Sequence, residues 1–164
     1  MTLKKLSKNF YISSIIVILI FVLDRISKLY VIYLSEKANA SEVFSSKYLN
    51  INLIWNEGIA FGLFSFEKNY LYNFLTLIIL LVLLTILLML IKSNGIGKYS
   101  FLMILGGAIG NVYDRILYKG VPDFIDFHIG DFHWFIFNVA DIFITVGILF
   151  MILIELTAKK IDIK

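Results

Sequence analysis

The chain has 164 residues, 60% of them hydrophobic and one of them proline, and its mean hydropathy is +0.88. A soluble domain of this size would have far more apolar surface than it could bury, so the composition excludes a soluble protein and indicates an integral membrane protein. The formal charge of +3 reflects lysines of the kind that orient membrane helices, not a surface that binds nucleic acid. The absence of cysteine excludes disulfides, thiol nucleophiles and thiolate metal sites.

A long apolar run over residues 10–34 follows Lys4, Lys5 and Lys8. Such a beginning also fits a secretory signal peptide, with Ala38-Asn39-Ala40 as a small-x-small cleavage site. The run is, however, long enough to span a bilayer, which takes roughly 20 residues, and the rest of the chain is also membranous. We therefore predict a retained first transmembrane helix over residues 10–34.

The longest polar interval, residues 35–69, comes next. Within it Leu49-Asn50-Ile51-Asn52-Leu53 alternates with a period of two, as a strand with one apolar face does. Residues 56–62 follow with two glycines, which allow tight turns and close approach of the backbone. We predict a small extracytoplasmic β-sheet that lies on the membrane.

Three further apolar runs, residues 70–91, 99–118 and 134–156, are each predicted to span the membrane. The third of the four helices carries small residues of the kind that let helices pack closely in lipid: Gly106, Gly107 and Gly110. We predict an all-α membrane protein, a bundle of four transmembrane helices with a small extracytoplasmic sheet, that forms one domain over residues 1–164.

The lysines orient these four spans. Both termini and the 92–98 turn fall on one side, which holds Lys4, Lys5, Lys8, Lys92, Lys98, Lys159, Lys160 and Lys164. The opposite side has only Lys37, Lys47, Lys68 and Lys119. By the positive-inside rule both termini are predicted to be cytoplasmic.

Polar residues interrupt the helices at a shared depth. At about 1.5 Å rise per residue, Asp24 lies roughly 20 Å from the inner end of its helix, Asn111 and Asp114 lie roughly 18 to 22 Å from theirs, and Asp141 lies roughly 10 Å from the outer end of the fourth. In a core about 30 Å thick these positions form one layer, about 10 Å beneath the outer surface. Because ionisable groups are costly in a membrane and mark functional sites by default, we predict a reaction or transport centre in this layer.

These polar residues also share helix faces, because the members of each set are three or four apart: Asp24 with Lys28, Asn111 with Asp114 and Arg115, and Asn138 with Asp141. We interpret Asp24 and Lys28 as a structural ion pair. Asp114 and Arg115 could neutralise one another, and Arg115 could also bind a peptide carbonyl or a lipid phosphate.

The loop after the third helix returns carboxyl groups toward the membrane. Asp123 follows Gly120-Val121-Pro122, from where it could meet Asp141. Asp126 lies in the same predicted strand, and the residues alone do not decide which of the two is reactive. Gly130-Asp131, between two aromatic runs, then predicts a hairpin on the outer surface.

Two carboxyl groups within hydrogen-bonding reach share one proton, so one can act as general base toward water and the other as general acid toward a carbonyl. That pair can hydrolyse an amide without a metal or a covalent intermediate. Ser13, Ser14 and Ser27 lack a nearby histidine, and no G-x-S-x-G motif occurs. The spacing of His128 and His133 matches no zinc signature, so we expect no metal.

A second class of protein, a small proton-coupled transporter or channel subunit, would also hold buried carboxylates within a helix bundle. It predicts a polar path open to both membrane faces. The polar groups of this chain instead lie in the outer half of the predicted spans, and the inner portions are free of charge. The transporter is therefore the alternative to a hydrolase.

Five segments resemble the motifs of the bacterial lipoprotein signal peptidase family, the type II signal peptidases. In chain order they are DRISK (24–28), NEGIAF (56–61), GGAIGNVYDR (106–115), VPDFID (121–126) and FNVAD (137–141). Their order, their separation and the four-span layout match over nearly the full chain. Pro122 stands where the family more often has valine, but it removes no catalytic group.

The resemblance implies a multi-pass aspartic endopeptidase of the bacterial inner membrane, which removes signal peptides from prolipoproteins by cutting before a diacylglyceryl-modified cysteine. It implies Asp123 and Asp141 as the catalytic dyad, near the outer face, and so selects Asp123 over Asp126. Residues expected to bind substrate or support the site are Asn56, Gly58, Asn111, Arg115, Asn138, Asp24 and Lys28. We expect no cofactor, a lipidated prolipoprotein and membrane lipid as partners, and a monomer.

Overall fold

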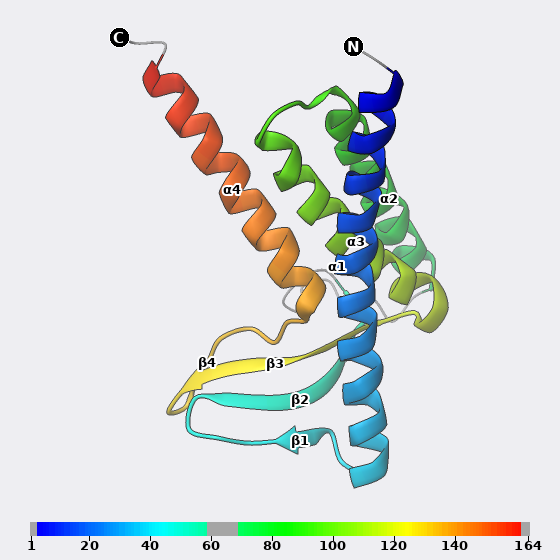
Figure 1. Cartoon of the computed structure of the whole chain (residues 1–164). Coiled ribbons are helices and arrows are strands. Elements are labelled where there is room, and N and C mark those ends of the chain that lie inside the picture. The colour runs from blue at the N-terminus through cyan, green and yellow to red at the C-terminus, as the bar shows by residue number, and fades with distance from the viewer. Residues whose placement is uncertain (1–2, 59–68, 162–164) are drawn as a thin grey trace.

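The structure is a computed structural model that describes residues 3–58 and 69–161, and it is mostly helical with a small antiparallel sheet at one end (Figure 1). In chain order the described elements are α1 (Leu3–Ala38), β1 (Glu42–Phe44), β2 (Leu49–Asn56), α2 (Asn69–Lys92), α3 (Gly97–Tyr118), β3 (Val121–Ile129), β4 (Phe132–His133) and α4 (Val139–Ile161).

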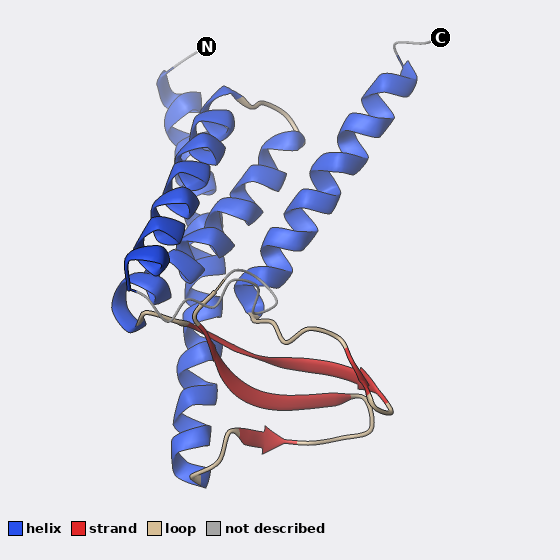
Figure 2. Ribbon diagram, turned by 180° about the vertical axis from the view of Figure 1, so that it is seen from behind, coloured by secondary structure: helices blue, strands red, loops and turns tan. Residues whose placement is uncertain are grey.

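Helix α3 is the centre of the helical layer, because it packs against α1, α2 and α4. Both chain ends lie at the end of the molecule remote from the sheet (Figure 1). Helix α1 is longer than the predicted 10–34 span and continues past the other helices alongside the sheet (Figure 2). It therefore joins the helical layer to the sheet.

The outer faces of the helices are apolar. Two described segments, Tyr72–Lys92 and Val139–Thr157, are long and apolar enough to cross a membrane, and only 11% of an apolar 18-residue stretch within each is buried inside the molecule. A core helix of a soluble protein would bury such residues, whereas a membrane helix turns them toward lipid. The exposed leucines and isoleucines of these helices are those of a membrane protein.

Glycines of α3 bring its neighbours close, as predicted from their size. A Cβ atom on Gly107 would lie 2.5 Å from the carbonyl oxygen of Ala140 in α4, and one on Gly106 would lie 2.9 Å from Cβ of Ile20 in α1. A Cβ atom on Gly110 would overlap the carboxylate of Asp24. The backbones of three helices therefore meet where α4 begins.

The sheet has the order β1-β2-β3-β4, with all pairs antiparallel. The predicted strand over residues 49–53 is confirmed and continues to Asn56, but the 35–69 segment supplies only β1 and β2 among the described strands. The other two strands form the predicted hairpin, which turns at Gly130 with φ +59°. The register of β2 against β3 shifts between Ile51 and Ile54, so a bulge bends β2.

The fourth helix begins at Val139, so the prediction that it starts at Trp134 was wrong. The carbonyl oxygen of Phe137 accepts hydrogen bonds from the N–H groups of Phe124 and Ile125. The N–H of Phe137 donates to the carbonyl oxygen of Ile125. Residues 134–138 thus run beside β3 rather than continuing the helix. These apolar residues belong with the sheet and not with the helix. A continuous apolar run does not show where an extended chain becomes a helix.

Candidate active site

The first turn of α4 is closed by a reciprocal pair of hydrogen bonds. Oδ1 of Asn138 accepts from the N–H of Asp141 at 3.1 Å, and Oδ2 of Asp141 accepts from the N–H of Asn138 at 3.1 Å. This is the capping-box arrangement, in which the residue before the helix and the third helical residue satisfy each other's N–H groups. The cap fixes the carboxylate of Asp141 at the start of α4.

Asp123, on β3, is held by amide groups from two directions. Its Oδ1 accepts from Nδ2 of Asn138 at 2.5 Å, and its Oδ2 accepts from Nδ2 of Asn56 at 2.8 Å. Asn138 therefore contacts both aspartates. Its Oδ1 and backbone N–H bond to Asp141, and its Nδ2 bonds to Asp123. We call Asp123 and Asp141 the dyad.

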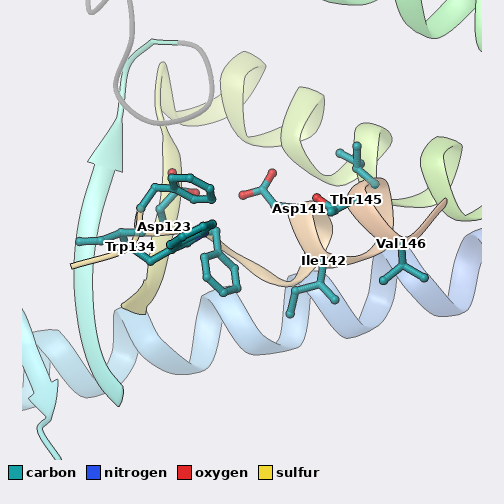
Figure 3. Close-up of a pocket in the computed structure, with 10 residues that line it drawn as sticks. Asp123, Trp134, Asp141, Ile142, Thr145 and Val146 are labelled. Atoms are coloured by element: carbon teal, nitrogen blue, oxygen red, sulfur yellow. The ribbon is translucent and has the colours of Figure 1, made fainter. Parts of the chain in front are cut away.

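The dyad lines one cavity of about 330 Å³ between the sheet and α4. Figure 3 shows the Asp141 carboxylate pointing toward the strand that carries Asp123. The other lining residues are largely apolar: Trp134, Phe135, Ile136, Phe137, Ile142, Ile144, Thr145 and Val146. Two acids thus face an apolar space that a substrate could enter.

Burial and charge together change the acidity of Asp123, which is 5% exposed. Its pKa is raised from the ordinary value to about 6, first because burial penalises the charged form and second because the charge of Asp141 lies nearby. The hydrogen bonds from Asn56 and Asn138 oppose this rise. Asp123 therefore carries a proton over a pH range in which an ordinary aspartate is ionised.

A second group of acids lies between α1 and α3 and is organised by Lys28. The ammonium group of Lys28 lies 2.7 Å from Oδ2 of Asp24, 2.8 Å from Oδ2 of Asp114 and 2.8 Å from Oδ1 of Asn111. Arg25 adds a second cation, with Nη1 2.5 Å from Oδ1 of Asp114. Two anions and two cations therefore neutralise one another. We call Asp24, Arg25, Lys28, Asn111 and Asp114 the ion cluster.

Two contacts connect the ion cluster to the dyad. Lys28 occupies the oxygen of Asn111, so the amide presents its nitrogen to Oδ1 of Asp141 at 2.8 Å. Oδ1 of Asp24 accepts the N–H of Ala140 at 3.0 Å, in the first turn of α4. The ion cluster therefore orients both a hydrogen-bond donor to Asp141 and the backbone that carries it.

Arg115 binds the backbone of Gly58, which follows β2. Its guanidinium donates to the carbonyl oxygen of Gly58 at 3.1 Å and to that of Asn111 at 3.2 Å. Asn56 Oδ1 accepts the N–H of Gly58 at 2.9 Å and closes a short turn. Residues 59–62 of the predicted glycine-bearing segment lie outside the described residues.

Comparisons with known proteins bear on this geometry. The family model described as signal peptidase (SPase) II matches residues 16–157. A lipoprotein signal peptidase of Pelagibacter ubique is 50% identical over 91% of this chain and 90% of its own, and that of Anaplasma phagocytophilum is 40% identical over 91% and 94%. The chain belongs to the signal peptidase II family.

Solved structures agree with this family. A bacterial membrane enzyme superimposes with a TM-score of 0.74 at 27% identity, over 90% of this chain and 88% of its own. A second bacterial membrane enzyme gives a TM-score of 0.70 at 27% identity, over 88% and 92%. This signal peptidase II family member is therefore a hydrolase with the fold of a membrane enzyme.

In this signal peptidase II family member the predicted site residues converge from distant parts of the sequence. The contacts above join α1, β2, α3, β3 and α4 through Asp24, Lys28, Asn56, Gly58, Asn111, Arg115, Asp123, Asn138 and Asp141. The predicted Asp24–Lys28 ion pair is confirmed. Asp126 does not line the dyad cavity and instead contacts Asn50 and His133.

Three assignments differ from the sequence analysis. Asp114 pairs with Lys28 and Arg25, so the suggestion that it neutralises Arg115 was wrong. Adjacent residues on a helix do not face each other, and the spacing alone argued against that pair. Sequence reasoning did not select Arg25 as a site residue, although it is a charged residue within an apolar helix. It also did not select Trp134, which lines the dyad cavity.

Proposed function

We propose that this chain is an aspartic endopeptidase that removes signal peptides from prolipoproteins before a diacylglyceryl-modified cysteine, with Asp123 and Asp141 activating water. The observation that carries the proposal is the pair of carboxylates that line one cavity and are both bonded to Asn138. The curated relatives described above are named lipoprotein signal peptidases, which supports this substrate class. Membership of a peptidase family removes the reason to keep the transporter alternative.

In this proposal the two acids share one proton. The ionised carboxylate takes a proton from water while the water oxygen attacks the carbonyl carbon, and the protonated carboxyl gives its proton to the carbonyl oxygen. The tetrahedral diol then collapses. Its C–N bond breaks, the acid formed in the first step protonates the leaving nitrogen, and the other carboxylate regains a proton from a diol hydroxyl. The dyad thus returns to its starting state.

The surroundings of the dyad supply what this chemistry requires. Burial and the nearby charge of Asp141 raise the pKa of Asp123 to about 6, so the pair of acids keeps a shared proton at a higher pH than free aspartates would. The amides of Asn56, Asn111 and Asn138 fix both carboxylates without neutralising either, because an amide carries no charge. Arg115 and Gly58 position the backbone beside the site, and we assign them to substrate binding.

The arrangement of helices supports the predicted topology. Helices α2, α3 and α4 lie on one side of the sheet, α1 continues past them alongside it, and both described chain ends lie away from the sheet (Figure 1). We propose that the four helices span the bacterial inner membrane, with both termini cytoplasmic and the sheet at the outer surface. A substrate anchored by acyl chains would then present its scissile amide at the level of the dyad, while its lipid stays in the outer leaflet.

Cleavage of a lipidated prolipoprotein peptide by the purified protein tests the mechanism. We expect Asp123→Asn and Asp141→Asn each to lower the rate by about 1,000-fold or more, because each removes one member of an acid–base pair. The control is Asp131→Asn, an exposed carboxyl group on the β3–β4 turn, which should keep the wild-type rate. A folded Asp123→Asn or Asp141→Asn protein with the wild-type rate would refute the dyad.

Reporter fusions test the topology. A fusion at Lys98, in the first turn of α3, should report the cytoplasm, and a fusion at Glu42, in β1, should report the exterior. The reverse pattern would overturn the orientation without affecting the dyad.

A further inference from the structure

The two histidines of the chain lie together on the β3–β4 hairpin, outside the dyad cavity. Asp126 and His128 are two residues apart on β3, so their side chains project from the same face. His133 on β4 is paired directly with His128 across the hairpin. The register of the strands therefore gathers two imidazoles and one carboxylate that are separated in the sequence.

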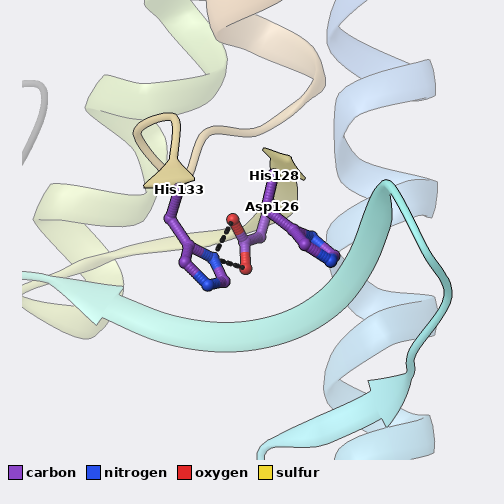
Figure 4. A group of neighbouring side chains, drawn as sticks. All are labelled: Asp126, His128 and His133. Atoms are coloured by element: carbon purple, nitrogen blue, oxygen red, sulfur yellow. Dashed lines mark hydrogen bonds and ion pairs between the residues drawn. The ribbon is translucent and has the colours of Figure 1, made fainter. Parts of the chain in front are cut away.

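The distances among these three side chains fit a shared ligand. One possible ligand atom from each lies within 4.8 Å of the others. Nδ1 of His133 lies 3.0 Å and 2.9 Å from the two carboxylate oxygens of Asp126 (Figure 4). Two atoms bound at about 2.0 Å to a tetrahedral ion are about 3.3 Å apart, so a small displacement of this pair admits an ion. The His128 ring stacks on that of His133 with 5.0 Å between centroids.

The surroundings provide support and access for such an ion. Asp126 is 3% exposed, and Nδ2 of Asn50 donates to it at 3.4 Å, as partners of metal-binding carboxylates commonly do. Half of the His133 side chain is exposed, which gives solvent access. Nδ1 of His128 is buried and has no hydrogen-bond partner among residues 3–58 and 69–161. Leaving a buried polar atom unpaired is unfavourable, and a ligand that it contacts would remove that cost.

We propose that Asp126, His128 and His133 bind one divalent transition-metal ion of the zinc class. Two imidazoles and one carboxylate are ligands suited to zinc rather than to magnesium or calcium, and they leave a fourth position for water. The ion joins β4, which is two residues long, to β3. Trp134 follows His133 directly and lines the dyad cavity, so the ion steadies one wall of that cavity. This differs from the expectation of no metal that rested on sequence spacing alone.

Zinc binding to the purified full chain, produced without a histidine tag, tests the site. Titration of Zn²⁺ against a chromogenic chelator should show one ion per chain. We expect His128→Gln and His133→Gln each to weaken binding more than about tenfold, since even partners of metal ligands have effects of that size. Because the chain has only these two histidines and no cysteine, the double variant should bind no zinc at this affinity. Absence of binding to the wild type, or unchanged binding in either single variant, would overturn the site.

A matched pair of carboxyl variants and a structural measurement complete the test. Asp126→Asn should lose zinc and Asp131→Asn, on the same hairpin, should keep it. If Asp126→Asn fails to fold, zinc binding by His133→Gln tests the site instead. The His133 side chain is half exposed, and its described contacts are the Asp126 carboxylate and the His128 ring, so we expect this variant to fold. Zn²⁺ should also slow amide hydrogen exchange at residues 132–134 in the wild type but not in His128→Gln. Equal exchange with and without zinc in the wild type would contradict the proposed link between β3 and β4.

Discussion

The ion cluster buries two aspartates, and the dyad combines the buried Asp123 with the partly buried Asp141, yet the partners of the two pairs differ. In the ion cluster Lys28 and Arg25 match Asp24 and Asp114 charge for charge. In the dyad the direct partners of Asp123 and Asp141 are amides and backbone N–H groups. Opposite charges stabilise ionised carboxylates, whereas amides orient them and leave two acids to compete for a proton. In our proposal the same residue type is thus structural in the ion cluster and reactive in the dyad.

The largest effect on stability should come from Lys28→Met, which leaves two buried acids with one fewer cation. Breaking a buried ion pair in this way typically costs about 3 to 5 kcal/mol, because the remaining charge is uncompensated. Thermal unfolding in detergent measures it, with Lys92→Met, an exposed lysine at the end of α2, as control. A Lys28→Met protein as stable as the control would show that the cluster is not held by charge.

The next effect concerns Asn111, which belongs to both groups. Asn111→Asp keeps an acceptor for Lys28 but replaces the donor to Asp141 with a second acid. We expect peptide cleavage to fall roughly 100-fold, within the range that acid–base catalysis contributes, while the protein stays folded. Asn94→Asp, in the exposed turn before α3, should cleave normally. Normal cleavage by Asn111→Asp would mean that the dyad does not depend on the ion cluster.

A smaller effect is expected from Gly110→Ala. The added methyl group would overlap the carboxylate of Asp24, which also accepts the N–H of Ala140. Overpacking of this kind costs about 1 to 3 kcal/mol, and it should lower both the unfolding temperature and the cleavage rate. Gly97→Ala, where a Cβ atom has nothing within 4 Å, is the control. Equal unfolding temperatures for the two variants would show that α1 can move away from α3 at no cost.

The last effect is a pH dependence carried by Asp123. Its pKa in the folded protein is about 6, above the ordinary value of 3.8, so its favourable contribution to stability is complete below about pH 4 and is lost as pH rises through about 6. Asp123→Asn removes this loss, because an amide does not ionise. The unfolding temperature of Asp123→Asn relative to the wild type should therefore increase between about pH 4 and pH 7. A constant difference would contradict a raised pKa.

Much of the site could be predicted because helix spacing is local. Asp24 and Lys28 share a face by their separation of four, and Asn138 and Asp141 by their separation of three, whatever the rest of the chain does. The contacts of Asn111 with Lys28 and Asp141 confirm that the polar faces of α1, α3 and α4 meet. The start of α4 could not be predicted, since residues 134–137 are as apolar as the helix that follows.

The sequence by itself determined the class of protein, the helical runs and the set of acids from which a site could form, because hydropathy and helical period are properties of neighbouring residues. Only the tertiary structure placed Asp123 in the cavity with Asp141 and turned Asp126 toward His133. The different positions of Asp123 and Asp126 depend on the pairing of β3 with β2 and β4, which joins residues far apart in the chain. Strand register decides which side of a sheet each carboxyl group faces, and no single segment contains that information.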